Sequence, residues 1–404
     1  MNRNKKKYSI CHVVYEEYPR DPRVRRYVNA LKDTGVNSII ICSRKKKDKY
    51  FEELNGSRIY RIPVSKKRAS FFITLIEYLV FTQISCIMLV YLGIKYGFRI
   101  IHVHTLPDFL VFSALWNKIF GAKIILDMHE IFPELYIART GTPENSYKVK
   151  LLKTAERWSI GFADKIITIH DNAKIILVSR NKETEKKIHI IMNSVDPAEY
   201  RSPRDSKVAG RIMDSDEFII TYNGTVVKLL NLTMIVEALA LLKSKMPPAD
   251  FKKITFRIYG DGPALDEILS LAKKSAVEDK VYYMGYIQPD EMRKEVLKTN
   301  VIILPPLKNI YSDLFYTIKL IEAVYLKIPV IATRLKTYTL YYGEDSLFYF
   351  ESGNLNELCA RIEDVFYKKE LVKKKTENAF KEYEKVGWNV MKLRYLNIIE
   401  ALHN

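Results

Sequence analysis

The sequence predicts an α/β protein built from two doubly wound domains, each with a parallel β-sheet covered by helices on both faces. Short β-branched runs alternate with longer helical patterns along most of the 404 residues, and this alternation is typical of βαβ units. The length exceeds that of one ordinary hydrophobic core and suits two domains. A polar, turn-rich stretch at 197–216 interrupts the alternation, so it is the predicted linker.

The first domain is predicted to cover residues 1–200. Its helix at 21–35 opens with Asp-Pro and closes with Gly, which are common helix start and stop signals. Two further helices are predicted at 107–120 and 146–161. The predicted strands are apolar and β-branched, and they lie at 8–15, 37–43, 99–104, 122–129, 164–170 and 187–196.

The second domain is predicted to cover residues 201–380. Its predicted strands lie at 217–225, 253–262, 280–286, 300–307 and 328–333, and its helices at 232–245, 263–276, 290–299 and the start of 313–333. A last helix at about 379–402 is apolar on one face, so we expect residues 381–404 to pack back on the first domain. Because ligands of doubly wound domains bind at the carboxyl ends of the strands, we expect a cleft between the two domains.

Charge and cysteine content narrow the functional classes. The formal net charge is +18, and residues 1–70 hold 19 Lys and Arg against 7 Asp and Glu. Such a basic segment indicates an acidic partner, which is nucleic acid, anionic lipid or a phosphorylated substrate. The four cysteines form no CxxC pair, which argues against a disulfide framework or zinc site and favours a reducing cytoplasm. The basic N-terminus runs directly into a predicted strand, so we expect no signal peptide.

A long apolar run from Ala69 to Ile94 lies within residues 66–97. It is long enough to span a bilayer. Glu77 would be costly at the centre of a membrane, and the strand that follows must pair with earlier strands. A core helix or helix pair and an interfacial helix are therefore the two main alternatives, and a true span is the third. The basic runs at 44–49 and 66–68 favour a helix lying on an anionic leaflet.

Glycine-rich loops follow two strands of the second domain. NGT at 223–225 and GDGP at 260–263 end predicted strands, and glycine there lets the backbone approach a ligand closely. Tight turns would use the same residues. Neither loop matches GxGxxG, so the sequence does not indicate a dinucleotide site.

Lys319 and Glu322 lie three residues apart at the start of a predicted helix, on one face. A lysine near a helix N-terminus adds charge to an anion site, which suits a diphosphate. A carboxylate one turn later can accept hydrogen bonds from the vicinal hydroxyls of a ribose. A surface ion pair is the alternative.

Histidines gather at strand ends of the first domain. His102, His104, His129 and Glu130 end two predicted neighbouring strands. Two histidines at i and i+2 share one face and could bind a metal, but no Cys or Asp cluster completes such a site. A histidine at a strand end is often only a satisfied polar group. Because both strands end toward the same cleft, a substrate role is the alternative that we expect.

Nine segments in order resemble one known family across nearly the whole chain. They are VYEEYPRDPRVRR, IIHVHTLPD, IILDMHEIFPE, ADKIITIH, MNSVD, ITYNGTV, RIYGDGP, YYMGYI and YTIKLIEAVYLKIPVIAT. This order is similar to the retaining glycosyltransferases of family 4, which have the GT-B fold of two Rossmann-like domains. The resemblance implies transfer of a sugar from a nucleoside-diphosphate donor, with the leaving diphosphate as the base and no metal or other cofactor.

The resemblance also assigns site residues. Glu322 matches the second Glu of a Glu-x7-Glu motif, which binds ribose, and Gly224 matches the Gly that admits the phosphates. The implied catalytic residues are His129, Lys228 and Lys319. The implied donor-binding residues are Gly224, Thr225, Gly260, Asp261, Gly262, Ile318, Leu320 and Glu322. The implied acceptor-side residues are Asp21 and Arg23 of the loop at 21–26, together with His104 and Glu130.

Two positions depart from the family pattern. Leu314, beside Asp313, stands where the motif has its first Glu, which holds hydroxyls of the donor sugar. After NGT the chain offers Lys228, but it has Leu229 and Asn231 where the family has a basic residue and Gly.

These observations lead to one expected function and two rivals. We expect a glycosyltransferase with a UDP- or GDP-linked donor. Its expected place is the cytoplasm, peripheral at the inner face of the cell membrane, and its expected acceptor is a lipid-linked saccharide of a surface polysaccharide. The first rival is a non-catalytic GT-B protein that binds a nucleotide sugar or a partner glycosyltransferase. Nucleic-acid binding is the second, and it is disfavoured because the basic residues flank an apolar run and form no readable motif.

Overall fold

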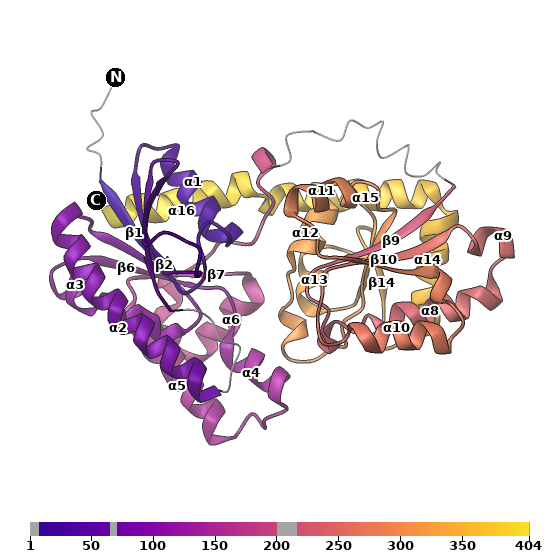
Figure 1. The fold of residues 1–404 in the computed structure, drawn as a ribbon, viewed down its shortest axis with the longest axis horizontal. Helices are drawn as coiled ribbons and strands as arrows, with labels where there is room; N and C mark the ends of the chain where they lie inside the picture. The colour runs from indigo at the N-terminus through magenta and orange to yellow at the C-terminus, as the bar shows by residue number, and fades with distance from the viewer. Residues whose placement is uncertain (1–7, 65–70, 200–215, 404) are drawn as a thin grey trace. The chain divides into compact units, whose positions relative to one another are not determined.

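The computed structural model describes residues 8–64, 71–199 and 216–403. The chain forms two compact units (Figure 1). One consists of Met1–Met192 with Asn389–Asn404, and the other of Asn193–Trp388. The boundary between them thus follows residue 192, whereas the sequence predicts it after residue 200. The returning C-terminal segment begins at Asn389, whereas the sequence predicts its start at residue 381.

The first unit is built on an eight-stranded sheet in the order β3-β4-β2-β1-β5-β6-β7-β8. All neighbouring strands are parallel except β3 and β4. The strands are β1 (Ser9–Val14), β2 (Asn37–Ser43), β3 (Phe51–Leu54), β4 (Ser57–Ile62), β5 (Ile100–His104), β6 (Lys123–Met128), β7 (Lys165–Thr168) and β8 (Ile188–Ile190).

The helices of the first unit cover this sheet. They are α1 (Pro22–Lys32), α2 (Phe71–Tyr96), η1 (Asp108–Ala114), α3 (Leu115–Ile119), α4 (Phe132–Thr140), α5 (Tyr147–Phe162), α6 (Asp171–Arg180), η2 (Lys182–Lys187) and α16 (Trp388–His403). Asp21 caps α1 by accepting hydrogen bonds from the backbone N–H groups of Arg23 and Val24. Arg180 of α6 ties two neighbouring helices, because it donates to both carboxylate oxygens of Glu156 in α5 and to Glu134 in α4.

The second unit has a six-stranded, all-parallel sheet in the order β11-β10-β9-β12-β13-β14. Its strands are β9 (Phe218–Asn223), β10 (Ile254–Tyr259), β11 (Val281–Gly285), β12 (Val301–Leu304), β13 (Val330–Thr333) and β14 (Phe348–Phe350). Its helices are η3 (Pro197–Glu199), η4 (Lys228–Leu230), α8 (Thr233–Lys245), α9 (Pro248–Phe251), α10 (Leu265–Lys274), η5 (Glu278–Lys280), α11 (Pro289–Val296), η6 (Ser312–Leu314), α12 (Ile318–Tyr325), α13 (Lys336–Tyr341), α14 (Leu355–Tyr367) and α15 (Lys369–Val386).

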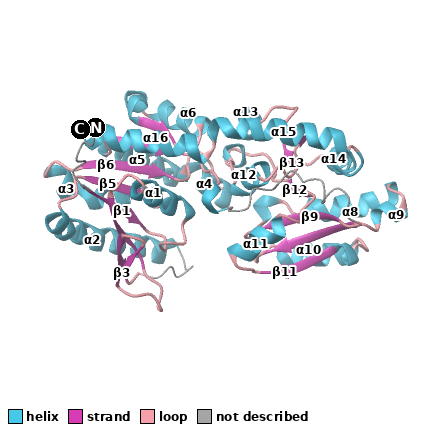
Figure 2. Ribbon diagram, turned by 90° about the horizontal axis from the view of Figure 1, so that it is seen from above, coloured by secondary structure: helices cyan, strands magenta, loops and turns pink. Residues whose placement is uncertain are grey.

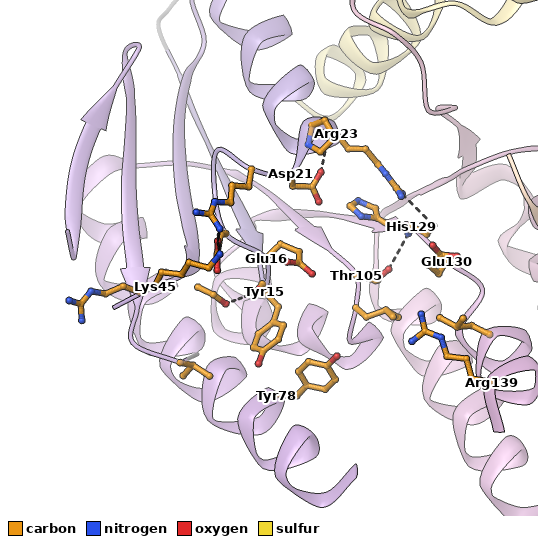
Figure 3. Close-up of a pocket in the computed structure, with 18 residues that line it drawn as sticks. Tyr15, Glu16, Asp21, Arg23, Lys45, Tyr78, Thr105, His129, Glu130 and Arg139 are labelled. Atoms are coloured by element: carbon orange, nitrogen blue, oxygen red, sulfur yellow. Dashed lines mark hydrogen bonds and ion pairs between the residues drawn. The ribbon is translucent and has the colours of Figure 1, made fainter. Parts of the chain in front are cut away.

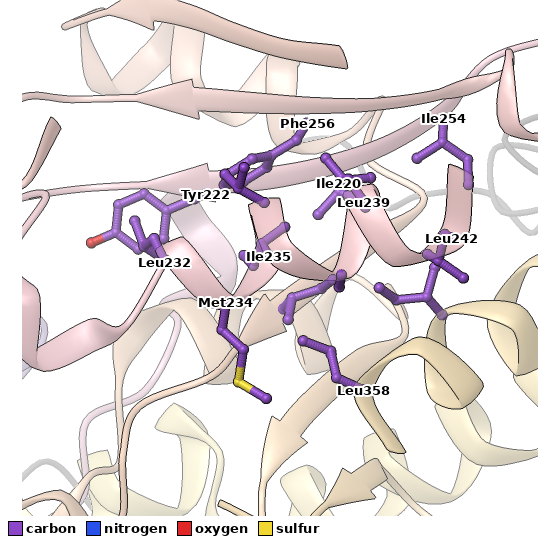
Figure 4. Close-up of a cluster of buried hydrophobic side chains, with 14 of the residues drawn as sticks. Ile220, Tyr222, Leu232, Met234, Ile235, Leu239, Leu242, Ile254, Phe256 and Leu358 are labelled. Carbon is purple, nitrogen blue, oxygen red and sulfur yellow. The ribbon is translucent and has the colours of Figure 1, made fainter. Parts of the chain in front are cut away.

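Apolar packing between α8 and the sheet forms the core of the second unit (Figure 4). Ile235 and Leu239 of α8 are fully buried together with Ile220 of β9 and Phe256 of β10. Because a parallel sheet is covered on both faces, its strands are apolar along their length and do not alternate with polar residues. This pattern explains why the strands were recognisable in the sequence.

The predicted last helix is divided in two. α15 ends before Gly387, and α16 is assigned to the first unit. Figure 2 shows α16 lying along the strands of that unit. Its Tyr395 hydroxyl lies 3.2 Å from His102 Nδ1, and Met391 Sδ accepts from the backbone N–H of Met192. The C-terminal helix therefore completes the core of the unit that the N-terminus begins.

The apolar run at 66–97 forms the single helix α2, although the basic run at 66–68 lies outside the described residues. Within the described part of the chain, α2 is long and apolar enough from Ile73 to Tyr96 to cross a membrane by length and composition. A buried helix passes the same test, but only 22% of the most apolar window is buried inside the unit. Most residues of that window are thus not buried inside the unit.

Candidate active site

A pocket of about 810 Å³ lies at the carboxyl ends of strands in the first unit (Figure 3). Parallel strands bring the residues that follow them to one edge of a sheet, so segments distant in sequence meet here. The lining includes the segments after β1, β2, β5 and β6, with Tyr78 from α2 and Arg139 from α4. Of the four predicted acceptor-side residues, Asp21, Arg23 and Glu130 line the pocket, and His129 lies beside them.

Two hydrogen bonds of the His129 backbone hold this residue in the pocket. Its backbone N–H donates to Thr105 Oγ1 at 3.1 Å, and its carbonyl accepts from Arg23 Nη1 at 3.3 Å. Burial alone would raise the pKa of the Asp21 carboxyl, but His129, Arg23 and the capped backbone N–H hold that pKa below its ordinary value. Asp21 is therefore ionised at neutral pH, and the Arg23 guanidinium is its cationic neighbour.

A network of buried histidines lies beneath the pocket. His129 Nε2 is 2.9 Å from Asp127 Oδ2, which is also 3.0 Å from His104 Nδ1. His104 Nε2 in turn lies 3.2 Å from His12 Nδ1. His104 has no exposed surface and does not line the pocket, so it lies behind the pocket wall, and its acceptor-side role stays a prediction. His104 supports Asp127, which in turn orients the His129 ring.

The same atoms are the candidate metal ligands of the first unit. His104, Asp127 and His129 place their ligand atoms within 4.8 Å of one another, as do His12, His102 and His104. Two imidazoles and a carboxylate are ligands that a divalent cation accepts. Hydrogen bonds between the rings and Asp127 account for the same distances, and the prediction that no metal is needed stays a prediction.

The two glycine loops of the second unit pair with each other. Gly224 N–H donates to Tyr259 O, and Val226 N–H donates to Asp261 O. Gly260 has a φ of +121°, and a Cβ there would lie 2.2 Å from the Gly224 carbonyl oxygen. A Cβ at Gly262 would lie 2.2 Å from Val226 O. Both positions require glycine because the loops lie backbone against backbone.

Lys319 lies against the first of these loops. Thr317 caps α12 through its hydroxyl, which places Lys319 in the first turn of the helix. A Cβ added to Gly224 would meet Lys319 Nζ at 3.0 Å, and Nζ lies 5.0 Å from the centre of the Tyr222 ring. Burial lowers the pKa of Lys319 to about 8, and the nearby charge of Glu322 acts in the opposite direction. An ammonium group is thus held at a helix N-terminus beside exposed backbone, an arrangement that can bind a phosphate oxygen.

The remaining predicted donor-site residues differ in their exposure and in their hydrogen-bond partners. Thr225 and Asp261 lie exposed in the two loops, and Asp261 Oδ1 accepts from Gly262 N–H. Ile318 is exposed at the start of α12. The Leu320 side chain is buried, and its N–H already donates to Thr317 Oγ1. Leu320 thus contributes to the core of the unit, and its N–H is not free for a ligand.

The positions that depart from the family pattern have clear local roles. Lys228 is 80% exposed and pairs with Glu267 at 3.1 Å, so it does not lie against Gly224 as Lys319 does. Asn231 has a φ of +51°; this left-handed conformation favours glycine and tolerates asparagine. Leu314 is buried. Asp313 Oδ1 accepts from the Lys336 N–H that opens α13, so this carboxylate is engaged locally.

Several side chains with a place in these sites were missed from the sequence. Among them are Asp127, which holds His129, Thr317, which caps α12, and Tyr222, which packs against Lys319. An N-cap threonine before a helical pattern is a readable signal for Thr317. An aspartate inside an otherwise apolar strand was the available signal for Asp127.

Comparison with known families assigns the chain. Residues 23–199 match the family described as "Glycosyltransferase Family 4", and residues 204–382 match the family described as "Glycosyl transferases group 1". Together these profiles span both units. The chain belongs to the family 4 glycosyltransferases.

Individual relatives of this glycosyltransferase are distant. The phosphatidylinositol N-acetylglucosaminyltransferase gpi3 subunit of Schizosaccharomyces pombe is 24% identical over 245 residues. That match covers 60% of this chain and 48% of the yeast protein, so the chain matches about half the length of this curated relative.

Solved structures share the fold over nearly the full length. Sucrose-phosphate synthase from Thermosynechococcus elongatus has a TM-score of 0.75 at 15% identity, with 98% of this chain and 99% of that chain covered. Anabaena HepE in complex with UDP-glucose has a TM-score of 0.65 at 12% identity, with 97% and 99% covered. The two-domain GT-B fold predicted from the sequence is thereby confirmed.

Proposed function

We propose that this protein is a retaining glycosyltransferase that moves a sugar from a nucleoside-diphosphate donor to an acceptor hydroxyl. The observation that carries the proposal is the position of Lys319, whose ammonium lies against Gly224 in the first turn of α12. Glu322 lies one turn later and is largely buried. This pair offers a cation for a diphosphate and a carboxylate for ribose hydroxyls. The UDP-glucose bound by HepE supports the same class of donor.

The proposed reaction needs no group beyond donor, acceptor and protein. The bond between the anomeric carbon and the diphosphate oxygen breaks, and the electron pair leaves with the diphosphate. The acceptor oxygen attacks from the same face, and its proton passes to the diphosphate oxygen. Lys319 stabilises the charge that grows on the diphosphate, which is usually the largest catalytic contribution in such a site. Lys228 can join it only by leaving Glu267, and His129 orients the sugar.

The acceptor we propose is a lipid-linked saccharide of a surface polysaccharide, met in the cytoplasm at the inner face of the membrane. The yeast relative supports a lipid acceptor, because its name specifies phosphatidylinositol. The pocket of the first unit has room for a sugar-sized group, and Tyr78 of the apolar helix α2 contributes to its wall. The four cysteines are all free, in accord with a reducing compartment.

A non-catalytic GT-B protein is the second candidate. Leu314 is buried where the family motif has a carboxylate for the donor sugar, and Asp313 caps α13. Such a protein would bind a nucleotide sugar without transferring it. Release of free nucleotide from a panel of UDP- and GDP-sugars separates the two candidates, because binding without turnover supports the non-catalytic one.

Binding of UDP and GDP by calorimetry tests the donor site directly. Glu322→Ala should weaken binding of the preferred nucleotide by ~1–3 kcal/mol, the usual loss for hydrogen bonds to a charged group. Glu370→Ala, which removes an exposed carboxylate from α15, is the matched control and should leave binding unchanged. If neither nucleotide binds, or if Glu322→Ala binds as the native protein does while its melting temperature is unaltered, the donor site is elsewhere.

A further inference from the structure

The helix α2 is a fixed part of the first unit. Four side chains at spacings of four, four and three residues are fully buried on one face: Phe81, Ser85, Leu89 and Leu92. Three hydrogen bonds secure the helix along its length. Glu77 Oε2 accepts from the Tyr15 hydroxyl at 3.3 Å, Asn117 Nδ2 donates to Leu89 O at 3.0 Å, and the Tyr96 and Tyr60 hydroxyls lie 2.7 Å apart. A transmembrane placement would have to break all of them.

The opposite face of α2 is apolar and exposed. Five large side chains, 43–84% exposed, recur at spacings of four, seven, four and three residues: Ile76, Val80, Ile87, Tyr91 and Ile94. At 3.6 residues per turn these positions lie along one line of the helix, about half a turn from the buried side chains. We call these five residues the α2 stripe. The helix is therefore apolar on both faces, but only one face is fully buried inside the unit.

Neighbouring elements extend the exposed apolar surface. α2 contacts α3 and η1, and η1 also contacts α5. Figure 1 shows α2, α3 and α5 along the same side of the unit. Trp116, Ile119 and Phe120 at α3 are 52–80% exposed, and Trp158 of α5 is 67% exposed. A surface of this kind, rich in aromatic and large aliphatic residues, marks an interaction site and not an ordinary solvent face.

The charges on these helices are mainly positive. The helices α2, α3 and α5 carry six cations, which are Lys95, Lys118, Lys148, Lys150, Lys153 and Arg157. Two of the six are in ion pairs, Lys118 with Asp164 and Lys153 with Glu144. The two acidic residues of these helices are Glu77 and Glu156. Glu77 accepts from Tyr15, and Glu156 is buried against Arg180. An apolar stripe with Trp beside it and Lys around it fits the boundary between anionic headgroups and acyl chains.

We propose that the α2 stripe, together with Trp116, Phe120 and Trp158, docks the first unit onto an anionic lipid bilayer, with α2 lying in the plane of the interface. The docking surface does not depend on the proposed transfer reaction. The purpose that we give to docking does rest on that function. Tyr78 of the same helix lines the pocket that also holds His129, which is the pocket proposed to receive the acceptor. Docking would bring this pocket to the membrane surface, where a lipid-linked acceptor presents its head group.

Flotation with vesicles of phosphatidylcholine, alone or mixed with phosphatidylglycerol, tests the docking surface. The native protein should bind the mixed vesicles and bind pure phosphatidylcholine weakly. The double variant Ile87→Gln, Ile94→Gln should lower partitioning onto mixed vesicles by about tenfold or more, because it removes two large apolar side chains from the interface. The matched double variant Ile175→Gln, Leu393→Gln changes two large apolar residues on α6 and α16, each 64% exposed, and should bind as the native protein does.

Each other outcome overturns the proposal. The first is a native protein that does not bind mixed vesicles, and the second is a stripe variant that binds them fully. Bound protein that alkaline carbonate cannot release would indicate a membrane span. Self-association that the stripe variant abolishes, without vesicle binding, would assign the surface to a second copy. Glu322→Ala should bind vesicles normally, so failure of the donor site and failure of the docking surface are separable.

Discussion

We expect donor binding at the partly buried ammonium of Lys319 to depend on pH. Its pKa is lowered to about 8 by burial, and a bound diphosphate stabilises the charged form. Below pH 8 the lysine is already protonated, whereas above it the lysine must take up a proton when the donor binds. Between pH 7 and pH 9 the protonated fraction falls from about nine tenths to about one tenth. We therefore expect affinity for a nucleotide sugar to fall about tenfold over this range, or ~1.4 kcal/mol.

Calorimetry of nucleotide-sugar binding measures this effect in two ways. The dissociation constant should rise between pH 7 and pH 9, and titrations at pH 9 in buffers of different ionisation enthalpy should show uptake of about one proton. Lys319→Met is the control, because it keeps an unbranched side chain but cannot titrate. The variant should bind weakly, and its affinity should depend little on pH. Ionisation of the nucleobase affects binding to both proteins alike, so comparing the two proteins removes its contribution. An unchanged pH slope in Lys319→Met, or no proton uptake in the native protein, would refute the reasoning.

Two further predictions concern stability. Gly260→Ala should lower the free energy of unfolding of the second unit by about 2–4 kcal/mol, because the new Cβ would overlap the facing backbone at a positive φ. Gly353→Ala, where φ is +77° but the space is open, should cost only about 1 kcal/mol. Equal losses in urea titrations of the two variants would contradict the close approach of the loops. Arg180→Met should cost about 3–5 kcal/mol, since it leaves Glu156 buried without its partner. Burial raises the pKa of Glu156, so the loss should shrink as the pH falls towards 5; a loss that is constant with pH would argue against an uncompensated charge.

Most of the fold was predictable because parallel strands buried on both faces read as continuous apolar runs. The hairpin of β3 and β4 was missed, since its strands are short and charged and pair at the edge of the sheet. The turn at Asn55 and Gly56, both with positive φ, was a readable signal for it. The break at Gly387 was also missed, because the apolar pattern continues on both sides of it.

The candidate sites were predictable as segments but less well as individual side chains. The motifs placed His129, Gly224 and Lys319 correctly at the ends of strands or the start of a helix, because loops that follow parallel strands share one edge. Whether a side chain points into a pocket or beneath it depends on tertiary packing. His104 was therefore expected beside the acceptor, although it lies wholly buried under Asp127.

The return of α16 to the first unit has a consequence for the order of folding during synthesis. The sheet that begins at β1 receives its last covering helix only after the whole second unit has left the ribosome. Until then the face that Met391 and Tyr395 will cover, including His102, stays open to solvent and to other chains. The unit that is translated first is thus completed last. Its partly exposed folding intermediate persists for the time that the ribosome needs to synthesise some two hundred further residues.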